Sequence, residues 1–185
     1  MKNGSKMNKR DKINLLVSGI LILFGIMLVI YPLLGELSPN RLLYIVLSIY
    51  GVIKLIEYTK SKIDGDKEDL YTGIICVLVA LSGIKFLNNN AAIVISMTLA
   101  SWTGLMAIIK LIKLDYYHDR GNIMIYTNLV TFSLFLLMGL LTSLNLYFDH
   151  TVQTLILGYF FIINGLLNLL EDAVRISFDY KKNKK

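Results

Sequence analysis

The sequence predicts an all-α, polytopic membrane protein with six transmembrane helices arranged as three repeated helical hairpins. Two observations on composition indicate the membrane class. Of the 185 residues, 55% are hydrophobic and only 17% are charged, and the mean hydropathy is +0.61, far from the averages of soluble globular domains. The third observation is that the apolar residues fall into six stretches, each close to the roughly 20 residues that a helix needs to cross a bilayer.

The predicted spans are joined alternately by short turns and by longer polar loops. The short turns make antiparallel helical hairpins at about residues 13–58, 70–114 and 123–173, and together residues 13–173 form one membrane domain. Pro32 and Pro39 bracket the first turn, because proline interrupts helices. The individual spans are expected at Ile13–Leu34, Leu42–Tyr58, Leu70–Leu87, Ala91–Leu114, Ile123–Phe148 and Val152–Leu170.

Basic residues at the span ends predict the orientation. Residues 1–12 form a basic amino-terminal segment and residues 174–185 a basic tail. Every lysine and arginine except Arg41 and Lys85 falls on the side that both termini share, if Lys54 is counted with that side. By the positive-inside rule, both termini are cytoplasmic. The first apolar stretch is too long for a signal peptide and lacks a small-x-small cleavage site, so we expect it to be retained.

Three similar segments indicate an internal repeat. GVIKLIEY begins at Gly51, GLMAIIKL at Gly104 and GLLNLLED at Gly165. Each has a glycine followed by apolar residues and, six positions later, a charge, namely Glu57, Lys110 and Glu171. A repeated supersecondary unit explains this pattern, although the high frequency of glycine in membrane helices leaves coincidence open.

Small residues form stripes on two of the predicted spans. Four-residue spacing places such residues on one helix face, where another helix can approach closely. We expect the stripes to pack against each other or against a second copy of the chain, and a narrow substrate path is the alternative. The fourth span carries Ala92, Ser96, Ala100 and Gly104, and the third carries Gly73, Cys76, Ala80 and Gly83.

Several polar residues lie within or near the ends of the spans. Lys54 and Glu57 are three residues apart, close enough to pair, and the lysine can extend toward the membrane surface as an anchor. Asn164 and Asn168 share a helix face with Asp172. These residues either make interhelical hydrogen bonds or line a polar vestibule. Because ionisable groups in a membrane are costly, they are candidates for function. The candidate polar or proton site is Lys54, Glu57, Asn164, Asn168 and Glu171.

The sequence offers no set of residues for catalysis or for metal or cofactor binding, so we expect a protein that is not an enzyme. Cys76 is the single cysteine, and His118 and His150 fall on opposite sides of the membrane, so no zinc spacing is present. The net charge of +6 comes from short runs beside the spans and not from a patch suited to nucleic acid. The expected partners are the lipid bilayer and either a second copy or another membrane protein.

The first hairpin carries a likeness to a known family. FGIMLVIYP at residues 24–32 is a glycine-bearing span that ends in proline, and SIYGVIKLIE at residues 48–57 follows in the second span. This pattern resembles the HdeD-like acid-resistance membrane protein family, as does TGLMAIIKL at residues 103–111. The resemblance implies three hairpins in a plasma (inner) membrane and, in some members, a role in acid or general stress tolerance. It implies no catalytic residues.

Three functions are compatible with the sequence. The first is a non-enzymatic membrane protein that contributes to acid or stress tolerance. The second is a small transporter or a proton or ion conduit that uses the polar groups on the side of the termini. The third is an accessory membrane subunit that binds a partner through the faces of small residues.

Overall fold

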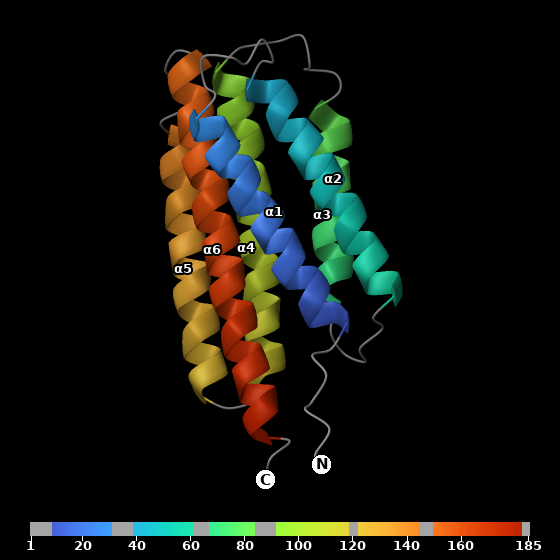
Figure 1. Ribbon diagram of the computed structural model, residues 1–185. Coiled ribbons are helices and arrows are strands. Elements are labelled where there is room, and N and C mark those ends of the chain that lie inside the picture. Colours follow the sequence, from blue (N-terminus) through green and yellow to red (C-terminus); the bar gives the residue numbers. More distant parts are fainter. Residues whose placement is uncertain are drawn as a thin grey trace.

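The computed structural model is a bundle of six helices (Figure 1). It describes residues 9–30, 39–60, 67–83, 92–118, 122–144 and 150–182, and these ranges contain no β-strand. The predicted all-α class is therefore confirmed for this part of the chain. The helices are α1 (Lys9–Ile30), α2 (Pro39–Lys60), α3 (Glu68–Gly83), α4 (Ala92–His118), α5 (Asn122–Leu144) and α6 (His150–Lys182).

Five of the helices are long and apolar enough to cross a membrane, as in a multi-pass membrane protein. The qualifying stretches are Asp11–Ile30, Arg41–Thr59, Ile93–Leu114, Asn122–Leu144 and Thr151–Ser177. α3 is not among them, since its 16 residues reach only about 24 Å at 1.5 Å per residue. The predicted third span continues to Leu87, and residues 84–87 lie outside the described part of the chain, as do the predicted ends of the first and fifth spans.

The helices run alternately in opposite directions, so that the beginning of α1 and the end of α6 lie at the same end of the bundle (Figure 1). We call this end the terminal end. It gathers the beginnings of α1, α3 and α5 and the ends of α2, α4 and α6 (Figure 1). These are the segments in which the sequence carries its intramembrane charges, so the topology brings those charges together.

The closest helix pairs are not the pairs expected from the hairpin interpretation. α1 packs most extensively on α6, α2 on α3 and α4 on α5, whereas α1 and α2 barely touch. Glycine sets these contacts: Gly25 of α1 lies against Gly158 of α6, and Gly51 of α2 lies against Gly73 of α3. Without side chains at these positions, the backbones can approach and gain dispersion contacts that lipid does not supply.

The small-residue stripes behave differently from each other. On α3, Gly73, Cys76, Ala80 and Gly83 are all buried, but Gly73 and Gly83 face α2 and not α4. On α4, Gly104 is exposed and no atom lies near it. α3 and α4 do pack on each other, and Cys76 of the α3 stripe contacts Trp102 of α4, but Gly104 of the α4 stripe takes no part in this contact. The opposite face of α4 turns inward because it carries Trp102 and the lysines that pair with carboxylates of other helices.

Individual residues of the α4 stripe have different surroundings. Ser96 is buried and donates a hydrogen bond to the carbonyl oxygen of Ser143 on α5. Ala100 is half-buried, and the side chain of Ala92 lies outside those described. The stripe therefore contacts α5 through Ser96 and reaches the surface of the bundle at Gly104.

The sixth helix extends well beyond its predicted end. Residues 174–185 were expected to form a basic tail, but α6 continues to Lys182. Its segment from Leu166 to Lys182 contains no glycine or proline that would end a helix. Arg175 within this extension is buried and bonded to carboxylates. The extension is therefore held to the bundle by ion pairs and not by apolar packing alone.

The contact between α1 and α6 leads to a prediction on stability. A methyl group at Gly25 would lie 2.6 Å from the carbonyl oxygen of Gly158, whereas nothing lies within 4 Å of the same position at Gly19. Gly25→Ala should lower the free energy of unfolding by about 1–3 kcal/mol through overpacking. Gly19→Ala should be neutral or slightly stabilising, because alanine favours helix over glycine by about 1 kcal/mol.

Thermal unfolding of both variants in detergent, followed by circular dichroism, measures the difference. Equal unfolding temperatures for the Gly25 and Gly19 variants would show that α1 and α6 do not approach at this glycine.

Candidate functional site

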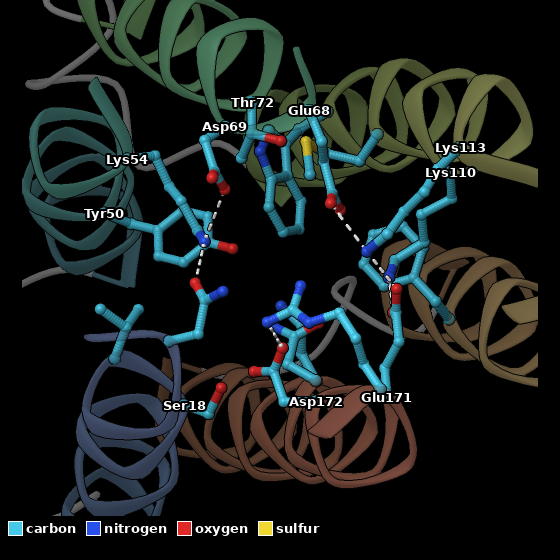
Figure 2. A pocket seen from close by; sticks show the side chains of 18 residues that line it. Ser18, Tyr50, Lys54, Glu68, Asp69, Thr72, Lys110, Lys113, Glu171 and Asp172 are labelled. Atoms are coloured by element: carbon cyan, nitrogen blue, oxygen red, sulfur yellow. Dashed lines mark hydrogen bonds and ion pairs between the residues drawn. The ribbon is translucent and has the colours of Figure 1, made fainter. Parts of the chain in front are cut away.

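A cavity near the terminal end is lined by side chains from all six helices (Figure 2). Eight of its lining residues are charged. The formal charges cancel, since four are cationic and four anionic. They are Lys54, Lys110, Lys113 and Arg175, and Glu68, Asp69, Glu171 and Asp172. We call these eight residues the charged cluster.

Lys54 of α2 is the centre of one half of the cluster. Its Nζ donates hydrogen bonds to Asn14 Oδ1 at 2.7 Å, to Asp69 Oδ1 at 2.9 Å and to Glu57 Oε2 at 3.0 Å. An ammonium group has three protons to donate, so all three can be used at once. These bonds join α1, α2 and α3. The predicted pairing of Lys54 with Glu57 is confirmed.

The direction of the Lys54 side chain differs from that of a surface anchor. The side chain is only 12% exposed and points into the bundle toward Asp69 (Figure 2). Glu57 is fully buried. An anchoring lysine would extend toward the polar surface of the membrane, whereas this lysine is retained inside by partners on three helices.

Glu171 of α6 is the centre of the other half of the cluster. Its carboxylate accepts hydrogen bonds from Lys110, at 3.1 Å, and from Lys113, both on α4. Lys113 also lies 2.7 Å from Glu68 of α3, and Figure 2 shows Lys113 between the two carboxylates. Because Lys110 and Lys113 are three residues apart, they share the inward face of α4. α3, α4 and α6 are therefore joined through charges.

Arg175 connects the end of α6 to the beginning of α1. Its Nη2 lies 2.8 Å from Asp172 Oδ1 and 3.0 Å from Asp11 Oδ1. Glu171 is four residues before Arg175 but pairs with lysines of α4 instead. The two neighbouring acids of α6 thus serve different helices: Glu171 serves α4, whereas Asp172 orients the arginine toward α1.

Burial decides how this cluster acts. Lys110, Lys113, Glu171, Asp172 and Arg175 are all less than a tenth exposed. In a low-dielectric interior, a well-arranged ion pair contributes little net stability, but removing one partner costs about 3–5 kcal/mol because a buried charge loses its counter-ion. The charges therefore constrain how the helices are placed without making the bundle unusually stable.

The size of the cavity limits what it can hold. It offers about 40 Å³ to the centres of water-sized molecules, and one water needs about 10–15 Å³ on this measure. There is room for about three waters. A cavity that binds benzene is about 150 Å³, so an organic solute does not fit here. Protons, water and single small ions are the species that match the space.

The predicted site residues are largely brought together. Lys54, Asn164, Asn168 and Glu171 all line the cavity, and Glu57 bonds to Lys54 beside it. Asp172 also lines it, as expected from its spacing with the two asparagines. The structure thus places four of the five candidates in one cavity, although they come from different ends of the sequence.

Sequence reasoning missed several residues of the site. Asn14 lies in the first apolar stretch, where an isolated amide was a usable signal. Glu68 and Asp69 were assigned to a loop, but they open α3, where acidic residues favour a helix start. The three-residue spacing of Lys110 and Lys113 was also visible. Their partners on other helices could not be read from spacing.

Comparisons with known proteins were made for the whole chain, and no family model, no curated protein and no solved structure matches it. Among the described residues, no group of three or more His, Cys, Asp or Glu side chains is placed to hold a metal ion. The geometry of the charged cluster is therefore the main basis for a functional proposal.

Lys54 provides a test of the cluster. Lys54→Met keeps most of the side-chain volume but removes the cation that Asn14, Glu57 and Asp69 share. We expect a loss of about 3–5 kcal/mol in the free energy of unfolding, the usual cost of removing one partner of a buried ion pair. Lys67→Met is the matched control, because Lys67 is exposed next to α3.

Chemical denaturation in detergent measures both variants. Adding Asp69→Asn to Lys54→Met should restore part of the lost stability, since coupled residues give non-additive effects. Strict additivity of the two changes would contradict the pairing.

Proposed function

We propose that the protein is a small membrane conduit for protons or small ions and that the charged cluster is its working site. The observation that carries this proposal is the cavity that all six helices line with buried, oppositely charged side chains. Ionisable groups inside a membrane protein are expensive and commonly mark proton or ion pathways. Helix packing alone needs no such groups, because glycine contacts already join the three closest helix pairs.

The chemistry of the lining favours protons over larger solutes. Asp69 and Glu171 bring carboxylates to the cavity, the type of group that carries protons in membrane pathways, and hydroxyl and amide groups of Ser18, Thr72 and Asn164 line the same cavity. Together with the roughly three waters for which the cavity has room, such groups can form the hydrogen-bonded chain that proton movement requires. The lysines and the arginine compensate the charge of the carboxylates and so offset the cost of burying them.

The biological role that fits this activity is tolerance of acid or of general stress. This role follows the resemblance to the HdeD-like family, whose plan of three hairpins in a plasma (inner) membrane we extend to this chain as a hypothesis. In this proposal the protein is not an enzyme and has six spans. Both termini face the cytoplasm, so that the charged cavity lies in the cytoplasmic half of the membrane.

A second candidate function is that of an accessory subunit. One observation favours it: Gly104 is exposed on α4 with nothing within 4 Å of the position that a side chain would occupy. An open glycine on a membrane helix allows a partner helix to approach closely. The partner would be another membrane protein or a second copy of this chain, and this role is compatible with the conduit.

Proton flux tests the conduit. Purified protein in liposomes under a pH gradient should carry protons, and Glu57→Gln and Glu171→Gln should each reduce the flux at least about a hundredfold, the lower end of what a positioned proton-transfer group usually contributes. Glutamine keeps the shape of glutamate but cannot bind a proton at neutral pH. Tyr126→Phe, at an exposed position of α5, is the control.

Flux of wild-type protein no greater than that of empty liposomes would reject the conduit, as would full activity in both glutamine variants.

A reporter fusion tests the orientation. A reporter joined after Lys185 should be active only in the form that works in the cytoplasm, because basic residues are concentrated on the side of both termini. A periplasmic or external signal from the same fusion would reverse the orientation and place the charged cavity in the other half of the membrane.

A further inference from the structure

The cavity ends at an aromatic wall. Trp102 of α4 and Phe135 of α5 line it together with Met106. Trp102 is 2% exposed, and its ring makes edge contacts with Phe135 and Phe160, each at 5.8 Å between ring centroids. On α4, Trp102 comes eight residues before Lys110, so this wall lies on the side of the cavity away from the terminal end of the bundle (Figure 1).

A polar pair lies on the far side of this wall. The hydroxyl groups of Tyr44 on α2 and Thr98 on α4 are hydrogen-bonded at 3.0 Å. On α4, Thr98, Trp102, Met106 and Lys110 follow at four-residue intervals, so they lie along one side of the helix. Four residues, about 6 Å of helix, separate Trp102 from Thr98, and eight residues, about 12 Å, separate it from Lys110. The indole therefore lies between two polar regions on the same helix face.

The phenylalanines of the wall are held differently from the tryptophan. Phe160 contacts Phe161 at 5.7 Å, and Phe161 contacts Phe24 at 5.7 Å, so this part of the wall is interlocked across α1 and α6. Trp102 instead donates its indole hydrogen bond to the Sγ atom of Cys76 at 3.2 Å. A thiol is a weak acceptor, and Met106, which also lines the cavity, is a flexible side chain. Turning the indole away therefore breaks this weak hydrogen bond together with the edge contacts to Phe135 and Phe160.

We propose that Trp102 is the gate of the conduit, held closed by its hydrogen bond to Cys76. This inference rests on the proposed proton conduit and adds the element that regulates it. With the indole in its observed place, the charged cluster is separated from the Tyr44–Thr98 pair. Because the cavity already reaches Trp102, water can join it to the Tyr44–Thr98 pair across about 6 Å of helix when the ring turns away.

The gate is tested by proton flux through liposomes with two variants. Trp102→Ala removes the ring, and Cys76→Ala removes only its acceptor. Cys76→Ala should raise the flux about fivefold, since losing one net hydrogen bond changes a two-state population by about that factor, and Trp102→Ala should raise it at least as much. Leu105→Ala is the control, because Leu105 is exposed on the same helix.

A double variant separates gating from a general leak. Trp102→Ala combined with Glu171→Gln should lose the increase if protons pass through the charged cluster. Persistence of the increase in the double variant would overturn the gate, because the flux would then bypass the cavity. Circular dichroism checks whether each variant retains its helices. If Trp102→Ala does not fold, Cys76→Ala still tests the gate.

The results distinguish this inference from the conduit itself. If wild-type protein conducts and both folded single variants conduct at the wild-type rate, the gate is wrong and the conduit stands. If neither the wild-type protein nor any variant conducts, the conduit is wrong and the gate falls with it.

Discussion

Charge compensation at the terminal end is the constraint on which the rest of the structure depends. A charged side chain inside a membrane protein is costly unless a counter-ion lies beside it. Lys54 meets this requirement through α1 and α3, Glu171 through α4, and Arg175 through α1. Each of these helices therefore has only one rotation about its axis that places its charges correctly. The apolar remainder of each helix then faces lipid or the aromatic core.

Glycine contacts and ion pairs hold different sets of helices together. Glycines allow close approach within the pairs α1–α6, α2–α3 and α4–α5, whereas ion pairs connect these pairs to one another, as Lys113 does between Glu68 of α3 and Glu171 of α6. Dispersion between close backbones is short-ranged and does not depend on protonation. The strength of an ion pair, in contrast, changes when one of its partners gains or loses a proton. A bundle built this way can change the contacts between its pairs while each pair stays intact, and such a change is what a gated conduit would require.

Hydropathy predicted the helices well because every backbone polar group in a membrane must be satisfied within a helix, so apolar length translates directly into structure. The ends were less predictable. α6 continues to Lys182 because Asp172 and Arg175 are compensated by each other and by Asp11, a pairing invisible in a list of charges. The Lys54–Glu57 pair was predictable because three-residue spacing in a helix places two side chains together. The partners of Glu171 were not predictable, since Lys110 and Lys113 are about sixty residues away in the sequence.

The sequence by itself determined that the chain is helical and apolar enough for a membrane, which residues carry charge inside the helices, and that these charges lie at one end. Those properties depend on composition and on local spacing alone. Only the tertiary structure decided that α1 packs on α6, that Gly104 faces outward, and that Trp102 lines the charged cavity. The reason is that partner choice depends on which faces of six helices fit together at once, and periodicity along a single helix carries no information about its neighbours.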